Sequence, residues 1–333
     1  MPTKPFQSIL KPHESEINQL RSEGITYRKI AELLNQKHAL SITHNAVYSF
    51  CNAKSRIRKN QHRFDENLDP DLREGLHKQI INLWTHNSNA IEGNTLTLGE
   101  TADILELGLT VSGKPLKDHQ EVYGHAKAIQ LIHNLLDKKS LDVNDIFTLH
   151  TAIMPKMPMD SLNPIGNWKR DYNGTSGVVG NETRYMEYAS PGDVPLLMKQ
   201  WLKEFNKLNC VNSSKKAIKA YSQAHMSFVR IHPFFDGNGR LARLLANIPV
   251  LRGGYPPILI SVDQRASYIK HLWDYQSTVG ELKQGQSLVP KHNTFNLFLG
   301  FIKSEWSTVM HLVKEAENKQ KKRQTDSERN GNG

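Results

Sequence analysis

The stretch HPFFDGNGRLAR, residues 232–243, brings together side chains that could carry out phosphate chemistry. His232 is the one group in it that can take up a proton at neutral pH. The Asp-Gly-Asn-Gly run that follows is unfavourable inside a helix, and its glycines allow main-chain N–H groups to surround an anion. The stretch therefore predicts a seat for a phosphate-sized anion with a base in front of it.

Two arginines and one carboxylate complete this seat. Arg240 and Arg243 lie three residues apart, so they share one face of the helix that begins here, and the helix N-terminus itself favours negative charge. Two such cations indicate more than one phosphate. Asp236 would repel a phosphate unless a cation lay between them, and Mg²⁺ is the natural choice. The predicted chemistry is attack of a hydroxyl on a nucleotide phosphate, with pyrophosphate as the leaving group.

The stretch also resembles the signature of the Fic (Fic/Doc) family, H-P-F-x-D/E-G-N-G-R-x-x-R, and it matches that signature at every defined position. The likeness extends from Ser88 to Gln276 and includes the segment GGYPPILI. Most members transfer AMP from ATP to a hydroxyl side chain of a target protein, so the resemblance implies a protein adenylyltransferase acting on Ser, Thr or Tyr. The Doc branch, which transfers phosphate, has lysine where this chain has Gly239, and the match therefore favours nucleotidyl transfer.

The resemblance implies a role for each position of the signature. His232 would deprotonate the target hydroxyl, Asp236 would hold Mg²⁺, and Phe234 would anchor the loop in the core. Arg240 would bind the outer phosphates of ATP, and Arg243 would help to hold the γ-phosphate. The anion hole for the phosphates would be formed by Gly237, Asn238 and Gly239.

An upstream motif bears on how the site is regulated. SNAIEGN, residues 88–94, fits the inhibitory pattern Ser/Thr-x-x-x-Glu-Gly/Asn-Asn of the family's N-terminally inhibited class. In that class Glu92 would form a salt bridge with Arg243, while Ser88 and Asn94 would help to fix the helix. A carboxylate on Arg243 removes a cation from the γ-phosphate, so ATP binds in a non-productive pose and the enzyme rests in an off state. Whether Glu92 also positions a water for the removal of AMP stays open.

Two further regions are assigned by the resemblance. The Gly-, Pro- and Asn-rich loop 166–191 corresponds to the family's flap, which holds the target segment by main-chain pairing. Tyr268 falls where relatives line the adenine pocket, with an ordinary partly buried tyrosine as the equal alternative, and Gln276 stands where some relatives have asparagine. The strand expected in the flap consists of Val178, Val179 and Gly180.

Helical apolar spacing predicts the elements that position these groups. The expected fold class is mainly α, a Fic-fold helical bundle with a short β-hairpin flap, plus a small N-terminal three-helix module. The expected domains are a helix-turn-helix-like module at 1–62, a helical region with the inhibitory helix at 63–140, the Fic core at 141–285, a C-terminal helix at 286–317 and a disordered basic tail at 318–333.

Residues 14–59 resemble the helix-turn-helix of bacterial regulators and resolvases, most clearly in GITYRKIAELLN. Thr26 and Thr43 are placed to cap the second and third helices. If the module binds DNA, the helix from Thr43 enters the major groove and the basic residues behind it meet phosphates. These basic residues are Lys54, Arg56, Arg58 and Lys59. The alternative is a small adaptor that binds protein or packs on its neighbour.

Composition sets wider limits on the function. The 333 residues carry a formal net charge of +10, which favours nucleotides, nucleic acid or other acidic partners. No apolar run approaches the roughly 18 residues that span a membrane. The first residues contain no apolar signal core, and the two cysteines, Cys51 and Cys210, indicate a reducing compartment without a structural disulfide. We therefore expect a cytoplasmic protein with no membrane partner.

Two other functions stay open at this point. One is a DNA-binding regulator whose Fic domain senses nucleotide or modifies itself. The other is a Fic transferase that uses another nucleotide, such as UTP or GTP. The predicted partners are ATP, an unidentified target protein or the chain itself, and DNA through residues 14–59, and a homodimer is a further option.

Overall fold

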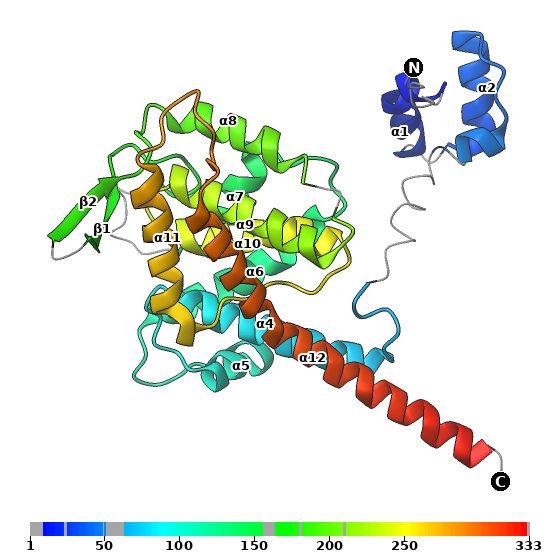
Figure 1. Cartoon of the computed structure of the whole chain (residues 1–333). Coiled ribbons are helices and arrows are strands. Elements are labelled where there is room, and N and C mark those ends of the chain that lie inside the picture. Colours follow the sequence, from blue (N-terminus) through cyan, green and yellow to red (C-terminus); the bar gives the residue numbers. More distant parts are fainter. Residues whose placement is uncertain are drawn as a thin grey trace. The chain divides into compact units, whose positions relative to one another are not determined.

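The computed structural model describes residues 9–22, 25–48, 50, 63–155, 164–179, 182–208 and 211–331 of the chain. The chain divides into two compact units, Met1–His62 and Arg63–Gly333 (Figure 1). Among the helices in these ranges, none combines the length and the apolar character needed to cross a bilayer.

The N-terminal unit is helical. It contains the 3-10 turn η1 (Lys11–His13), α1 (Glu14–Ser22), α2 (Tyr27–His38) and a further helical stretch at 44–48. The hydroxyls of Thr26 and Thr43 accept hydrogen bonds from the N–H groups three residues on, each at 3.3 Å, so both predicted caps are confirmed. The small core that joins these elements consists of Leu10, Ile17, Ile30, Ala31, Leu34 and Val47. The four basic residues expected to meet DNA, Lys54, Arg56, Arg58 and Lys59, lie outside the described residues, as do both cysteines.

The larger unit is a helical bundle with one small hairpin, which confirms the predicted fold class. Its helices are α4 (Pro70–Ala90), α5 (Leu98–Leu107), α6 (Leu116–Leu135), α7 (Val143–Ile153), α8 (Val194–Phe205), α9 (Ser214–Ile231), α10 (Asn238–Arg252), the 3-10 turn η2 (Val262–Gln264), α11 (Arg265–Val279) and α12 (Asn293–Gly331). Thr97 caps α5 with a capping box, as its position before the apolar residues predicts.

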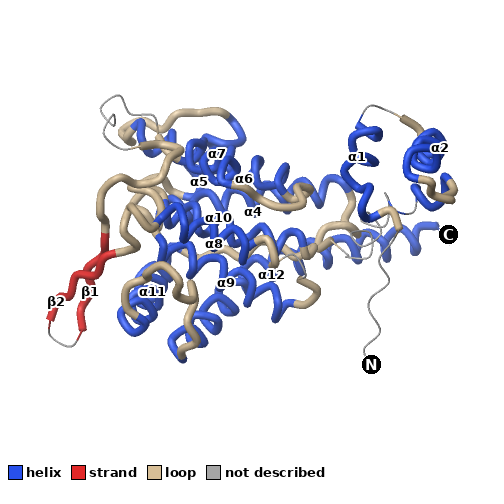
Figure 2. The backbone as a smooth tube through the Cα atoms, turned by 90° about the horizontal axis from the view of Figure 1, so that it is seen from above, coloured by secondary structure: helices blue, strands red, loops and turns tan. Residues whose placement is uncertain are grey.

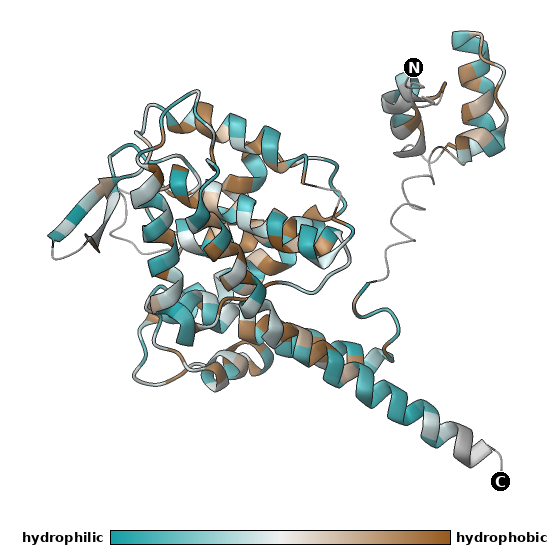
Figure 3. Ribbon diagram, in the orientation of Figure 1, coloured by the Kyte–Doolittle hydropathy of each residue, from teal (hydrophilic) through white to brown (hydrophobic). Residues whose placement is uncertain are grey.

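Helix α10 lies at the centre of this bundle. Every residue from Arg240 to Val250 is buried, and α10 packs on α9, α6, α7 and α4 (Figure 2). The small residues Ala220 and Ala224 on α9 allow close packing, and Trp201 of α8 packs edge-on against Phe228 at 5.3 Å between ring centroids. The apolar residues of these helices face the interior of the bundle, whereas the far end of α12 is hydrophilic (Figure 3). The signature stretch therefore sits between the two most deeply buried helices.

The hairpin consists of β1 (Gly174–Val179) and β2 (Glu182–Glu187), paired antiparallel from Gly174 opposite Glu187 to Val179 opposite Glu182. It projects from the helical body beside α11 (Figure 1). A side chain at Gly177 would overlap the ring of Trp273, so glycine allows β1 to pass close to α11. The predicted strand at Val178 and Val179 is confirmed, while Gly180 lies outside the described residues.

The prediction of a disordered tail from residue 318 is wrong, because α12 continues to Gly331. Lysine, glutamine and arginine in this segment are good helix formers. The segment also has partners at the start of α4. Gln320 accepts a hydrogen bond from the N–H of Asp69 at 2.8 Å, and Arg323 pairs with both oxygens of Asp71 at 2.8 and 2.6 Å. These contacts join residues about 250 positions apart in the sequence, so the local composition could not predict them.

Candidate active site

The signature loop connects α9 to α10 and is held by its own side chains. His232 ends α9 in the left-handed conformation, with φ of 51°, and Gly237 has φ of 78° just before α10. The side-chain oxygen of Asn238 accepts from the N–H of Phe234 at 2.9 Å, and its amide donates to the carbonyl of Phe234 at 2.8 Å. The side chain of Asn238 is therefore used to close the loop, and only its main chain is left to face a ligand.

Helix α7 contacts the loop through the side chain of His150. The buried ring of Phe234 stacks on the imidazole of His150 from α7, with 3.7 Å between ring centroids. Nδ1 of His150 accepts from the N–H of Gly166 at 2.9 Å, so its Nε2–H donates to the carbonyl of Asp236 at 3.0 Å. Burial lowers the pKa of His150 to about 4, which keeps this ring neutral and fixes its tautomer. Phe234 is thus the expected anchor, whereas His150 was missed because nothing in the sequence of α7 sets it apart.

His232 presents an unprotonated ring nitrogen at the signature loop. Its ring lies parallel to that of Tyr188 at 3.8 Å, and Nδ1 contacts the carbonyl of Val229 at 3.2 Å. Because a carbonyl only accepts, Nδ1 carries the proton and Nε2 is left as an acceptor. Burial, assisted by the nearby ammonium of Lys169, lowers the pKa of His232 to about 3. The imidazole is therefore neutral near pH 7, with Nε2 unprotonated.

The guanidinium of Arg243 is held by hydrogen bonds and an ion pair. Its Nη2 lies 2.8 Å from Oε1 of Glu92, so the predicted pair between these residues is present in the structure. The same guanidinium donates to Oγ and to the carbonyl of Ser88, at 3.1 and 2.6 Å. Burial works against the charge on Arg243, but the carboxylate of Glu92 and the hydroxyl of Tyr268 together more than offset it and raise the pKa of the guanidinium.

The carboxylate of Glu92 also lies against the main chain that would hold the anion. A Cβ built on Gly239 would overlap Oε1 of Glu92 and would approach Nη1 of Arg243 to 3.2 Å. Gly239 is in the first turn of α10, where N–H groups without helical partners face outward. Glu92 therefore occupies the place that a phosphate oxygen would take at this helix N-terminus.

The segment that carries Glu92 is tied to α6. The amide of Asn94 donates to the carbonyl of Asp118 and to Oε2 of Glu121, each at 3.0 Å. The N–H and hydroxyl of Thr95 both donate to the carboxylate of Asp118, at 2.8 and 2.6 Å. The side chain of Asn94 thus holds the turn after α4 against α6.

Arg240 has an acidic partner that the sequence did not reveal. Its Nη1 donates to Oε1 of Glu121 at 2.9 Å, and both side chains are buried, with 2% and 7% exposed. Because Asn94 holds the other oxygen of Glu121, the same carboxylate connects the turn after α4 to Arg240. The sequence held one indication of this pairing, because the acidic Glu121 stands among the buried positions of α6, which include Val122 and His125.

We expect the substitution Glu121→Gln to destabilise the fold strongly. It leaves the buried charge of Arg240 without its nearest counter-ion, which costs about 3 kcal/mol. Urea unfolding followed by circular dichroism measures this loss, and Glu204→Gln on the surface of α8 serves as the control, with a change within about 0.5 kcal/mol. Equal stability of the two variants would contradict a supporting role for Glu121.

Asp236 faces outward from the same loop. Its side chain is 60% exposed and lies 3.6 Å from Arg240. Oδ1 accepts from the N–H of Gly237 at 2.6 Å, and Oδ2 is the oxygen that lies near Arg240. An exposed carboxylate beside an anion seat fits a hard cation that also binds phosphate oxygens.

Tyr268 has two predicted roles, a contact with adenine or that of an ordinary partly buried tyrosine. Its position in the structure favours a supporting role. It is buried, and its hydroxyl lies 2.9 Å from Nε2 of His225 and 3.4 Å from Nη1 of Arg243. The ring therefore supports Arg243 from behind, and Tyr268 is not among the residues that line the neighbouring cavity.

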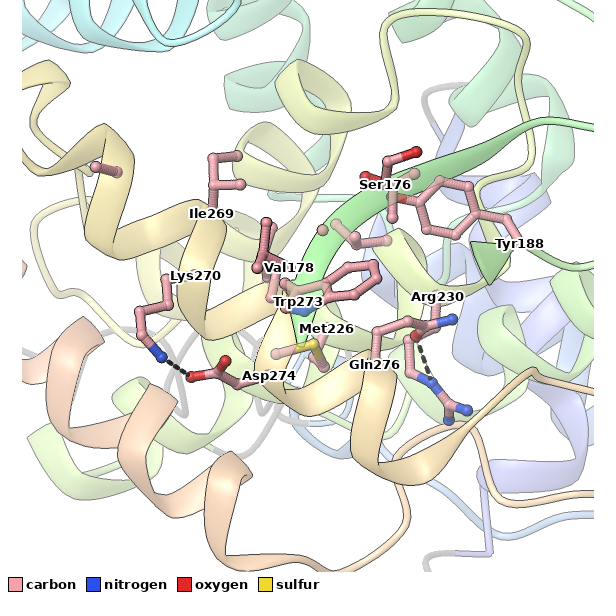
Figure 4. A pocket seen from close by; sticks show the side chains of 15 residues that line it. Ser176, Val178, Tyr188, Met226, Arg230, Ile269, Lys270, Trp273, Asp274 and Gln276 are labelled. Atoms are coloured by element: carbon pink, nitrogen blue, oxygen red, sulfur yellow. Dashed lines mark hydrogen bonds and ion pairs between the residues drawn. The ribbon is translucent and has the colours of Figure 1, made fainter. Parts of the chain in front are cut away.

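That cavity has a volume of about 340 Å³ and lies between β1, α9 and α11. Figure 4 shows Trp273 of α11 beside Val178 of the hairpin, and Ile269 of α11 is a further lining residue. Gln276 closes one end. Its oxygen accepts from Nε of Arg230 at 3.0 Å, while its buried Nε2 has no hydrogen-bond partner in the described residues. The cavity next to the signature loop thus combines apolar walls with polar side chains, among them Lys270, Asp274 and Gln276.

Comparisons with known proteins agree with this geometry. Residues 140–249 match the model of the Fic/DOC family, a range that contains the signature loop but not Glu92. The protein adenylyltransferase Fic of Drosophila ananassae is 35% identical over 277 residues, which cover 80% of this chain and 48% of the relative. The protein adenylyltransferase fic-1 of Caenorhabditis elegans is 30% identical over 240 residues, covering 69% and 43%. The chain spans less than half the length of these two relatives.

Solved structures show the same fold. The Fic domain containing signaling protein of Bacteroides thetaiotaomicron superimposes with a TM-score of 0.67 at 27% identity, covering 76% of this chain and 92% of that one. Fic-1 of Caenorhabditis elegans gives a TM-score of 0.55 at 25% identity, covering 91% and 78%. Together with the complete signature at residues 232–243, these matches show that the chain contains a Fic/DOC-family domain at residues 140–249.

Proposed function

We propose that this protein transfers AMP from ATP to the hydroxyl of a serine, threonine or tyrosine, on a target protein or on itself, and that Glu92 holds it in an off state. The observation that carries the proposal is the Glu92–Arg243 ion pair at the N-terminus of α10, beside a neutral His232. The names of the curated relatives, which are protein adenylyltransferases, support the reaction type.

The side chains of the signature loop would each contribute to the transfer. Nε2 of His232 accepts the proton of the target hydroxyl, whose oxygen attacks the α-phosphorus of ATP. The bond from the α-phosphorus to its bridging oxygen breaks, and pyrophosphate leaves. Arg240 and the first N–H groups of α10 stabilise the charge on the phosphates, and Arg243 holds the γ-phosphate once Glu92 has released it.

Asp236 would hold Mg²⁺, and the exposure of its carboxylate in front of the loop fits that role. When bound, the cation would neutralise part of the phosphate charge. We expect Asp236→Ala to lower the transfer rate by about 100-fold and to remove its dependence on Mg²⁺ concentration. The rate is measured against Mg²⁺ concentration, with the exposed Asp103→Asn on α5 as the control. A fully active Asp236→Ala variant would refute the metal role.

The base of the nucleotide is assigned to the cavity beside the loop. Trp273 and Ile269 provide apolar surface for a planar ring, and Nε2 of Gln276 can donate to an acceptor nitrogen of a purine. Edge strand β1, with Val178 exposed, is proposed to pair with the segment of the target that carries the hydroxyl. A transferase that uses UTP or GTP in the same cavity is the alternative.

The proposal is tested with the Glu92→Gly variant and ATP labelled in the α- or the γ-phosphate. AMP transfer places only the α-label on protein, and excess unlabelled ATP, but not GTP or UTP, suppresses it. Transfer of the γ-label, or equal competition by all nucleotides, would exclude adenylylation. Addition of cell lysate, followed by mass spectrometry of the labelled peptides, identifies the target and the residue modified.

DNA binding remains a second proposal for residues 14–59, supported by the two capped helical segments around one small core. If it is correct, the full chain retains duplex DNA with a steep loss of affinity as salt rises, and a chain lacking residues 1–62 does not. Light scattering on the same samples reports whether the protein is a homodimer, and incubation of adenylylated protein with the wild type reports whether AMP is also removed.

A further inference from the structure

The N-terminal unit brings two imidazoles and one carboxylate together at the point where α1 begins and α2 ends. The three residues are His13 of η1, Glu16 in the first turn of α1 and His38, the last residue of α2. One side-chain ligand atom from each lies within 4.8 Å of the other two, and Nε2 of His38 is 2.8 Å from Oε2 of Glu16. The rings of the two histidines face each other, with 4.1 Å between their centroids.

We infer that His13, Glu16 and His38 form a binding site for a transition-metal ion, with Zn²⁺ as the fitting one. Two imidazole nitrogens and one carboxylate oxygen are a donor set that zinc takes in a tetrahedral site, with water in the fourth position. Mg²⁺ and Ca²⁺ prefer oxygen ligands and do not suit this set. All three side chains are partly exposed, so the ion has a path from solvent.

The surroundings of Glu16 suit a metal ligand. Its Oε1 accepts from the ammonium of Lys37 at 2.8 Å, while Oε2 is the oxygen directed to His38. A carboxylate that binds an ion through one oxygen and accepts a hydrogen bond through the other is held in place by that second contact. The ion therefore replaces the short contact between Oε2 and His38, and the bond to Lys37 stays.

A metal ion at this position would stabilise the N-terminal unit. The described part of the N-terminal unit has a core of six buried apolar residues, and small domains gain much from a metal that joins their segments. His38 is followed by Ala39, whose φ of 51° is unfavourable for a residue with a side chain. A metal bond at His38 would fix the end of α2 just before this strained residue and would connect it to the start of α1.

The test uses the complete chain, freed of metal by a chelator, and titration with Zn²⁺ against a chromophoric competitor. Wild type and the variants His13→Ala, Glu16→Gln and His38→Ala are compared with His44→Ala, an exposed histidine of the same unit that is outside the cluster. His13→Ala is the most informative change, because His13 takes no part in the ion pair of Glu16 with His38. Circular dichroism of each metal-free variant confirms that the fold is kept.

We expect His13→Ala and His38→Ala to lower the affinity for Zn²⁺ by at least about tenfold and to remove one bound ion per chain, with His44→Ala unchanged. Co²⁺ in place of Zn²⁺ gives the visible absorption of a four-coordinate site in the wild type and in His44→Ala, but not in His13→Ala or His38→Ala. If His13→Ala binds Zn²⁺ as tightly and in the same amount as the wild type, the cluster is an ion pair between helices and the inference is wrong.

Discussion

Replacement of His232 by alanine is expected to lower AMP transfer by the Glu92→Gly protein by at least about 100-fold. Burial and the nearby Lys169 keep the imidazole of His232 neutral, and its Nδ1 is engaged by the carbonyl of Val229, so Nε2 is free to act as the base. We propose that Asp236 holds the cation, and the two arginines stay charged, so His232 is the one proton acceptor expected within the signature loop.

The controls for this variant separate loss of the base from loss of the fold. His311→Ala removes an exposed histidine of α12 and should leave both the rate and the melting temperature unchanged. Binding of ATP by His232→Ala should also persist, since the imidazole makes no predicted contact with the phosphates. A rate in His232→Ala within a few-fold of the parent would contradict the assignment of the base.

The pH profile offers a further readout of the same residue. Because the pKa of His232 lies near 3, below its ordinary value, the base stays neutral when the pH falls from 8 to about 5. We therefore expect kcat/KM of the Glu92→Gly protein to stay level over this range. A decrease centred near pH 6.5, the ordinary value for histidine, would show that the imidazole is exposed to solvent in the active form.

Replacement of Glu92 by glycine is expected to raise AMP transfer by about 10- to 100-fold. The carboxylate of Glu92 pairs with Arg243 at 2.8 Å and lies against Gly239, so it takes both a cation and space from the γ-phosphate. Its removal leaves Arg243 held by Ser88 and Tyr268, in position for the nucleotide. Glu92 follows the end of α4, where glycine breaks no helix.

Graded variants test whether the charge of Glu92 is what inhibits. Glu92→Gln keeps the size of the side chain and removes its charge, so it should give an intermediate rate. Glu106→Gln on α5, whose carboxylate only accepts from the exposed Asn82, should behave as the wild type. Unchanged activity in both Glu92 variants, under conditions in which His232 is required, would argue against an inhibitory role.

The residues that the sequence predicted best are those close together in the chain. The loop from His232 to Arg243 could be interpreted directly, because glycines, asparagine and arginines at fixed spacing determine a loop and a helix start. Glu92 lies about 150 positions upstream of Arg243, and only the family's inhibitory motif indicated their pairing. Residue spacing alone would not have connected them.

The residues that were missed act from other elements. Glu121, His150 and Tyr188 reach the loop from α6, from α7 and from the position just after β2, and each looks like an ordinary residue of its own segment. For Tyr268, the position in the sequence agreed with a nucleotide contact. In the structure its hydroxyl instead contacts His225 and Arg243. Which side of a buried helix faces the site depends on packing between distant segments, and local patterns do not contain that information.

The central claim is that the protein transfers AMP through His232 and that Glu92 restrains it. One time course tests both parts, with α-labelled ATP and four proteins: the wild type, Glu92→Gly, His232→Ala and the double variant. We predict rapid labelling by Glu92→Gly, slow labelling by the wild type and none by the two proteins that lack His232. Equal labelling by the wild type and Glu92→Gly, or labelling by the double variant, would contradict the account.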